Sequence, residues 1–175
     1  QDSVSESIRL EGQYGRPLSL SYRYSVLGDI YLKSGQAAAA VAPRRKALEI
    51  RESVNAAEIL KIRARYGLAE ALFASGEPVG AVMLLGGQHD QAQALGFPLD
   101  AAKIAVILAG STTQVNKEQL LEAALAAESH GEVELQWSAL RLLSLQLARE
   151  ESATQAIFFG KTTVNLIQKV RAGLR

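Results

Sequence analysis

Tyr24-Ser25-Val26-Leu27-Gly28-Asp29-Ile30-Tyr31 is the stretch that decides the fold. Bulky side chains recur here at helical spacing around one small residue. Three later stretches of helix length repeat the pattern, and the small residues that align are Gly28, Ala69, Ala105 and Ser144. A repeat period of about 40 residues is typical of stacked helix pairs, which directs the search for function to a binding surface.

The composition indicates a folded chain with little net charge. Of its 175 residues, 48% are hydrophobic, and the formal net charge is +1. Acids and bases are interspersed, which gives no electrostatic reason to expect a nucleic acid or an anionic membrane as partner. No apolar run approaches the roughly 20 residues of a membrane helix. The chain has no cysteine, which excludes disulfides, cysteine-ligated zinc and a thiol nucleophile within it.

Glycine and proline predict where the helices end. Gly35 is expected to terminate the first full helix, and Gly76 a later one, as glycine does just past a C-terminus. Pro43 falls inside the next apolar pattern, where proline costs about 3 kcal/mol. We therefore expect a kink there or a helix that begins near Ala42. Further helices are predicted over residues 56–74, 101–109, 116–129, 132–149 and 153–170, with a loop over 110–113.

Two local signals refine these boundaries. Gly86-Gly87 predicts a break, because two adjacent glycines destabilise a helix by about 2 kcal/mol relative to alanine. A short helix is expected to follow over residues 88–95. Asn116 and Gln119 have the spacing of a capping box, in which each side chain bonds the backbone N–H of the other.

A partial helical pattern runs through the start of the chain, residues 1–17, by way of Val4, Ile8 and Leu10. This segment is interpreted as the tail of an earlier helix pair. No polar cap of the kind that closes such arrays is recognisable at this end. With Gln1 in first position and no signal peptide, the chain is expected to be a processed product or a fragment of a longer array.

Residues 21–54 resemble a tetratricopeptide repeat. The resemblance is carried by bulky, small and turn residues at that family's positions: Tyr24, Leu27, Gly28, Tyr31, Gly35, Ala40, Ala47 and Leu48. Less complete copies cover residues 62–95, 98–131 and 137–170, and residues 1–17 form a partial leading helix. The resemblance implies an all-α, right-handed superhelix that makes one domain of residues 1–175.

The tail has a more specific resemblance. Residues 156–168, AIFFGKTTVNLIQ, resemble the last repeats of bacterial proteins that join a tetratricopeptide array to a caspase-like CHAT peptidase domain. The array precedes the peptidase in that family, so the resemblance implies a regulatory or recognition array with no activity of its own. It also implies a bacterial protein, in the cytoplasm or, if Gln1 follows a removed signal peptide, in the periplasm or outside the cell.

In the tetratricopeptide family, the first helix of each pair lines a concave groove. The resemblance places the following candidate peptide-binding residues there: Tyr22, Asp29, Arg63, Tyr66, Glu70, Phe73 and Arg141. The first half of this groove is polar and aromatic, which suits anchoring of an extended peptide or a helix. The second half, which includes Val106 and Leu145, is mostly apolar.

Other candidate sites have a simpler interpretation. The basic groups Arg44-Arg45-Lys46 and Lys61/Arg63/Arg65 are expected to be solvated surface, because residues two apart on a helix point in different directions. His89 and His130 have no histidine or cysteine partner in the sequence, and are interpreted as structural or surface residues. No Ser/His/Asp set has motif context. We therefore expect no catalytic residue, no metal and no cofactor.

The sequence favours a non-enzymatic protein-interaction scaffold. The expected partner is a protein, a peptide or the missing domain in cis, with neither nucleic acid nor membrane involved. Exposed terminal helix pairs are expected to be able to form a homodimer. The alternative is a small-molecule sensor module, as in transcription regulators with helical repeats of similar length. A closed apolar pocket near Val106 and Leu145 would favour the sensor, and an open polar groove the scaffold.

Overall fold

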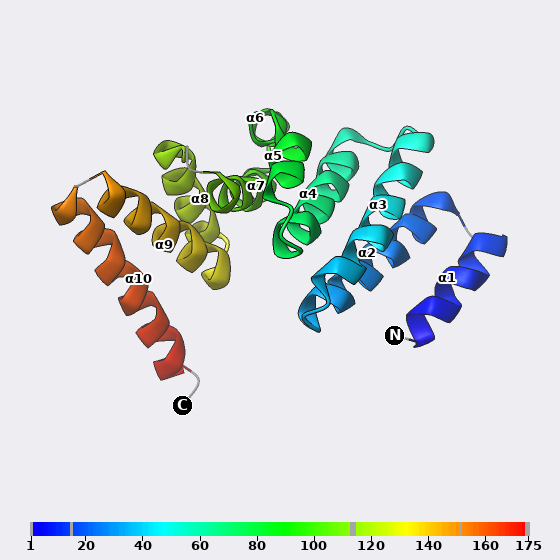
Figure 1. Cartoon of the computed structure of the whole chain (residues 1–175), viewed down its shortest axis with the longest axis horizontal. Coiled ribbons are helices and arrows are strands. Elements are labelled where there is room, and N and C mark those ends of the chain that lie inside the picture. Colours follow the sequence, from blue (N-terminus) through cyan, green and yellow to red (C-terminus); the bar gives the residue numbers. More distant parts are fainter. Residues whose placement is uncertain (1, 15, 113–114, 151, 174–175) are drawn as a thin grey trace. The chain divides into compact units, whose positions relative to one another are not determined.

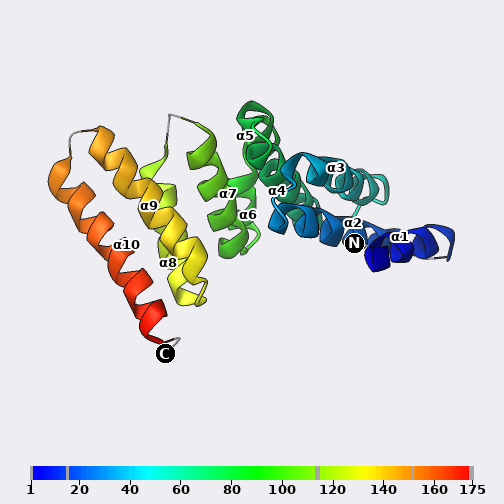
Figure 2. The same cartoon turned by 60° about the horizontal axis from the view of Figure 1, so that its bottom comes forward.

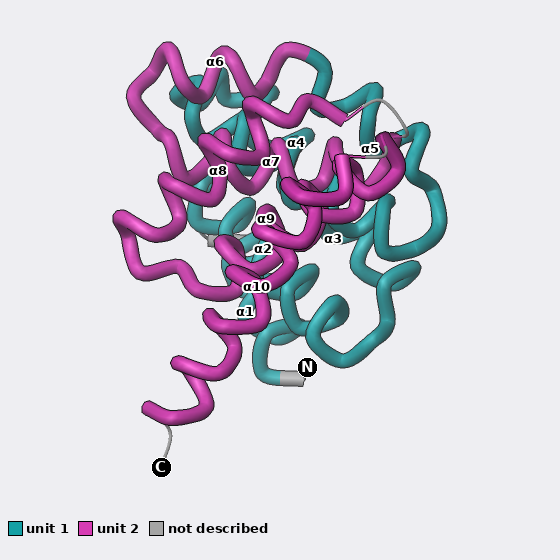
Figure 3. Tube along the Cα trace, turned by 90° about the vertical axis from the view of Figure 1, so that its left-hand side faces the viewer, with its two compact units in different colours: residues 1–86 teal, residues 87–175 magenta. Residues whose placement is uncertain are grey.

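The computed structural model describes residues 2–14, 16–112, 115–150 and 152–173, and every regular element in these ranges is an α-helix (Figures 1 and 2). The all-α prediction is therefore confirmed. The helices divide into two compact units, residues 1–86 and residues 87–175 (Figure 3). The division falls between the two glycines at which the sequence predicts a break.

The described residues of unit 1 form five helices that pack in chain order. They are α1 (Asp2–Tyr14), α2 (Pro17–Lys33), α3 (Ala37–Ser53), α4 (Glu58–Ala74) and α5 (Pro78–Leu85). Each helix packs against the next, and α2 also touches α4. Helix α3 therefore contacts two helices that meet each other, which makes its inward face the centre of the unit.

Unit 2 repeats this arrangement. Its helices are α6 (Gln88–Ala94), α7 (Pro98–Ser111), α8 (Lys117–Ser129), α9 (Val133–Arg149) and α10 (Ala153–Gly173). Consecutive helices pack together, and α7 also touches α9. Small and branched residues of α7 to α10 form one apolar core, in which Leu120 and Ala139 are fully buried. Alanine at the contacts lets the helix axes approach closely.

The predicted helix ends are confirmed at the turns between helices. Gly35 has φ +75°, and the N–H of Gln36 donates to the carbonyl of Tyr31 at 2.8 Å. This pattern is a Schellman motif, which needs a residue in the left-handed region just after the helix. Gly76 follows α4 in the same way. Asn55, with φ +46°, takes this place after α3.

The break at Gly86-Gly87 is confirmed too. Helix α5 ends at Leu85 and α6 begins at Gln88, with Gly87 at φ +71° between them. A positive φ at this position is accessible to glycine at low cost, which explains why a glycine stands between the two helices.

Two predicted boundaries differ from the structure. Of the two alternatives at Pro43, the start near Ala42 is wrong, because helix α3 begins at Ala37 and contains Pro43; a kink at Pro43 stays a prediction. Pro43 is buried, and packing of the surrounding face outweighs the loss of one backbone hydrogen bond. Helix α7 covers residues 98–111, which is longer than the predicted 101–109 and includes Ser111 of the predicted loop. Pro98 is suited to the first helical turn; Thr113 lies outside the described residues.

The predicted capping box is half formed. The side chain of Asn116 accepts a hydrogen bond from the N–H of Gln119 at 3.1 Å. Among the described residues, the Gln119 side chain accepts no hydrogen bond from the N–H of Asn116; its Nε2 lies 3.1 Å from Nδ1 of His89. His89 is buried, so the side chain that the box would use links α8 to α6 instead.

Candidate interaction surface

Helix α3 presents a stripe of alternating alanine and arginine to α2 and α4. Its members are spaced by four, three and four residues and share one helix face: Ala40, Arg44, Ala47 and Arg51. The arginines are 8% and 9% exposed, and the alanines are buried completely or almost so. Arginine is rarely buried to this extent without charged or polar partners. The contacts of these two side chains therefore decide how unit 1 is built.

Arg44 passes between glycines of the two neighbouring helices. A Cβ atom added at Gly28 of α2 would lie 2.7 Å from the Cγ, Cδ and Nε atoms of Arg44. A Cβ atom at Gly67 of α4 would overlap its Nη1 atom. Both glycines are buried. The arginine thus occupies space that exists only because neither helix has a side chain there.

At the end of this passage, the guanidinium meets two carboxylates. Nη2 of Arg44 pairs with Oδ1 of Asp29, and lies 3.6 Å from Oε2 of Glu70. The arginine side chain is 9% exposed, whereas those of Asp29 and Glu70 are 50% and 39% exposed. Arg44 of α3 therefore places its positive charge at the outer face of α2 and α4, where it pairs with one carboxylate from each helix. Two carboxylates against one guanidinium leave this cluster net negative.

Tyr66 completes the cluster. Burial raises the pKa of its phenol above the usual value, and the negative charge of Glu70, with which it also forms a hydrogen bond, raises it further. The side chain is half-buried beside the carboxylates. Tyr66 therefore stays a neutral hydrogen-bonding group at the edge of the surface.

Arg51 makes the matching link two turns along α3. Its Nε donates to Oγ of Ser21 at 3.1 Å, its Nη2 to Oγ of Ser25 at 3.2 Å, and its Nη1 to the carbonyl of Leu60 at 2.8 Å. Burial lowers the pKa of Arg51, and the charges of Arg44 and Arg63 lower it further. Guanidinium nevertheless remains charged in proteins, so Arg51 joins α2 to α4 as a cation.

The prediction of a solvated surface is wrong for Arg44. Arg45 and Lys46 are exposed, but Arg44 points inward and is buried. Charge alone suggested solvent, because the glycines that make room for Arg44 belong to the preceding and the following helix and lie far from it in the sequence. The available signal was the spacing of Arg44 and Arg51, which places two arginines in register with buried alanines.

The structure brings three of the seven candidate groove residues together. Asp29, Tyr66 and Glu70 form the cluster around Arg44. Arg63 and Phe73 belong to the same helix as Tyr66 and are exposed, with Phe73 at 40%. The five candidates Asp29, Arg63, Tyr66, Glu70 and Phe73 define what we call the α2–α4 surface.

The other two candidates lie elsewhere. Tyr22 is 66% exposed and lines a cavity of about 300 Å³ together with Ser3, Val4 and Ser7 of α1. It therefore faces the preceding helix. Arg141 belongs to unit 2, where its guanidinium carbon lies 5.5 Å from the ring centroid of Trp137. This stacking gives Arg141 a partner within its own helix.

No group of three or more His, Cys, Asp or Glu residues in the described ranges is placed to hold a metal ion. Among the helices described, none is both long and apolar enough to cross a bilayer.

Comparison with known proteins adds no relative. No model of a known protein family matches the chain, and no curated protein matches it either. The resemblance to tetratricopeptide repeats therefore rests on the residues of this chain alone.

Proposed function

We propose that this chain is a non-enzymatic protein-interaction module that recognises a segment of a partner protein. The α2–α4 surface carries the proposal, because buried Arg44 fixes two half-exposed carboxylates beside Tyr66. Preorganised polar groups bind with less loss of conformational entropy than mobile ones. Exposed Phe73 supplies an aromatic anchor on the same helix. Arg44 and Arg63 balance the charges of Asp29 and Glu70 on this surface, so the two half-exposed carboxylates, as hydrogen-bond acceptors, favour a segment that contains lysine or arginine.

We also propose a superhelical fold for the chain and a larger protein to which it belongs. Helix pairs that pack in order, with α2 against α4 and α7 against α9, support a tetratricopeptide-type superhelix. The tail sequence supports membership of a bacterial protein with a downstream CHAT peptidase domain. The bound segment would then belong to a partner protein or to that domain in cis. Sequencing of the gene beyond the codon for Arg175 tests this context, and a downstream His and Cys in an α/β pattern is the expected result.

Peptide binding tests the function itself. A phage-displayed library of random peptides is selected on the full chain, and the selected peptides are synthesised and titrated by calorimetry. Selected sequences are expected to be rich in lysine and arginine. Phe73→Ala removes the aromatic anchor and Glu70→Gln one of the negative charges. Each is expected to weaken binding about tenfold or more.

Matched controls keep this test specific. Phe158→Ala removes an exposed phenylalanine from α10 of unit 2, and Glu49→Gln an exposed carboxylate from α3. Both are expected to leave the affinity unchanged. Equal affinity of Phe73→Ala, Glu70→Gln and the parent chain would remove the α2–α4 surface from the account, and failure to select any binding peptide would contradict the function.

The second candidate function is the small-molecule sensor, which is favoured by an apolar pocket other than the one that the sequence predicts. Leu145 is 43% exposed and Val106 packs against the core of unit 2, so these residues do not form the closed pocket that the sensor requires. An apolar pocket of about 390 Å³ lies instead between α9 and α10, lined by Trp137, Ile167 and Val170 among others. This volume suits a drug-sized ligand. Trp137 is the sole tryptophan, so a shift of its fluorescence on addition of an apolar ligand tests this candidate.

A further inference from the structure

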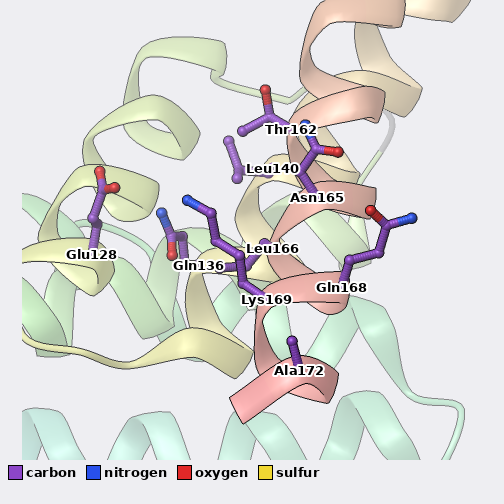
Figure 4. Close-up of a pocket in the computed structure, with 9 residues that line it drawn as sticks. All are labelled: Glu128, Gln136, Leu140, Thr162, Asn165, Leu166, Gln168, Lys169 and Ala172. Carbon is purple, nitrogen blue, oxygen red and sulfur yellow. The ribbon is translucent and has the colours of Figure 1, made fainter.

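A second pocket in unit 2 has a lining unlike that of the apolar one. Its volume is about 540 Å³, and it is bounded by three consecutive helices, α8, α9 and α10 (Figure 4). Leu140 and Leu166 supply apolar surface, while polar residues form most of the rest. Figure 4 shows Gln136 and Lys169 near each other in the middle, with Glu128 to one side and Asn165 and Gln168 to the other.

The polar side chains of this pocket are available for a ligand. Within the described ranges, the amides of Gln136, Asn165 and Gln168 and the ammonium of Lys169 form no hydrogen bond or ion pair with another residue. Asn165 lies three residues before Gln168 and four before Lys169, so the three share one side of α10. Gln136 approaches from α9. Helices α9 and α10 thus contribute three carboxamides and one cation to the lining of this pocket.

The chemistry of these groups selects one kind of ligand. Each carboxamide offers an acceptor oxygen and an N–H donor, the same pair that a peptide unit presents. Several carboxamides along one wall can therefore bond consecutive main-chain groups of an extended segment. The apolar surface of Leu140 and Leu166 suits one aliphatic side chain of that segment.

The charges argue against other ligand classes. Among the described residues of the lining, Lys169 is the one cation, and the carboxylate of Glu128 shares the pocket with it. A phosphorylated ligand or a nucleic acid calls for several cations or an arginine fork. An apolar small molecule is held mainly by apolar side chains, whereas polar residues outnumber apolar ones here.

We propose that the pocket between α8, α9 and α10, defined by Gln136, Leu140, Asn165, Leu166, Gln168 and Lys169, binds the main chain of an extended peptide segment. The inference rests on the proposed function, because it assumes that the chain recognises protein segments. It adds a second site, on residues outside the predicted groove, with recognition through carboxamides in place of the charges of the α2–α4 surface.

Backbone N-methylation tests main-chain recognition directly. Peptides selected from the random display library on the full chain are resynthesised with one amide nitrogen methylated at a time. Binding is measured by fluorescence anisotropy. Methylation of a contacting amide removes a donor and is expected to weaken binding about tenfold or more, which corresponds to about 1.4 kcal/mol. In the same peptides, exchange of a side chain that points to solvent is expected to have no effect.

Protein variants connect this effect to the pocket. Asn165→Ala and Gln168→Ala are expected to weaken binding of the same peptides about tenfold. In these variants, methylation of the contacting peptide amide is expected to cause no further loss of affinity, because the carboxamide that it bonded has been removed. Both positions are exposed on α10, so the variants are expected to fold, which circular dichroism checks. Gln155→Ala, an exposed glutamine of the same helix outside the pocket, is expected to bind as the parent chain does.

The possible results distinguish failure of the pocket assignment from failure of the proposed function. Peptides that bind but ignore both N-methylation and the Asn165 and Gln168 variants overturn the pocket assignment, and leave peptide binding in place. Selection that yields no binding peptide overturns both. Loss of affinity in the pocket variants together with N-methyl sensitivity supports the site, whatever the Phe73→Ala variant does.

Discussion

At the scale of the residue, Arg44 has the largest influence on unit 1. Its burial depends on two glycines in two other helices, and its charge is met by Asp29 and Glu70. The spacing of Arg44 along α3 indicates that it faces inward, but no local pattern identifies its glycine and carboxylate neighbours, because propensity and periodicity describe one segment at a time. The candidate residues Asp29, Tyr66 and Glu70 could be placed from the repeat, but the cation that unites them could not.

Gly28→Ala tests the fit of Arg44. The added methyl group would lie 2.7 Å from three atoms in the middle of the arginine side chain, and burial leaves that chain little room to move. We expect the free energy of unfolding to fall by about 1–3 kcal/mol, as overpacking does. Urea denaturation measures it. Gly12→Ala in α1, where a Cβ atom meets nothing within 4 Å, serves as the control and is expected to be neutral or stabilising.

The relative stability of the two variants can also contradict this placement of Arg44. If Gly28→Ala is as stable as Gly12→Ala, Arg44 does not occupy the space beside Gly28. The passage between α2 and α4 would then have to be abandoned.

Tyr66 predicts a stability change at alkaline pH. Its pKa in the folded state is raised above the value of about 10 for an unfolded chain. Above pH 10 the unfolded state therefore loses the phenol proton while the folded state keeps it. The stability linked to this proton is present below about pH 10 and is lost as the pH rises further.

The measurement is the urea midpoint between neutral pH and about pH 11 for the parent chain and for Tyr66→Phe. We expect the alkaline decrease to be smaller in the variant, because it has no phenol to ionise. Tyr22→Phe, at an exposed position, controls for loss of a tyrosine and is expected to follow the parent chain. Parallel curves for Tyr66→Phe and the parent chain would show that burial does not hold this proton.

At the scale of the element, the sequence predicted most helix ends correctly. Gly35 and Gly76 close helices by a motif that depends on three or four consecutive residues, and such local signals are visible in a single sequence. One of the two alternatives for α3, a start near Ala42, is wrong because the alanines before Pro43 extend the helix and the buried face holds it together. Gln119 was also misassigned, since its partner His89 belongs to another helix.

Asn116→Ala tests the cap of α8. The lost side-chain acceptor for the N–H of Gln119 is expected to lower the free energy of unfolding by about 1 kcal/mol. Asn165→Ala, in the interior of α10 and without a cap to lose, is expected to cost nothing, because alanine is the better helix former. Equal urea midpoints for the two variants would show that Asn116 does not cap the helix.

At the scale of the whole molecule, the repeat period led to the prediction of an all-helical chain with helices packed in order, and the structure confirms both. The superhelix and its single domain remain predictions, since the helices fall into two compact units. Pairing of two copies through terminal helices is also untested. Helix α10 does expose Ile157, Phe158 and Val164, which are the kind of side chains that such a contact would use.

The pocket between α8, α9 and α10 could not be predicted from the family resemblance. Its carboxamides lie on α9 and α10, at positions that the resemblance does not assign to the groove. Spacing along α10 places Asn165 and Lys169 on one side of a helix, but the approach of Gln136 from α9 depends on tertiary packing.

The central claim is that this chain binds a protein segment on defined surfaces, and amide NMR of the full chain tests it most directly. A selected peptide is titrated into isotopically labelled protein. We expect chemical-shift changes around Phe73 and Glu70, around Asn165 and Gln168, or at both places, including the side-chain amides of the pocket. Spectra that do not change at saturating peptide, or that change only at residues outside both surfaces, would contradict the account.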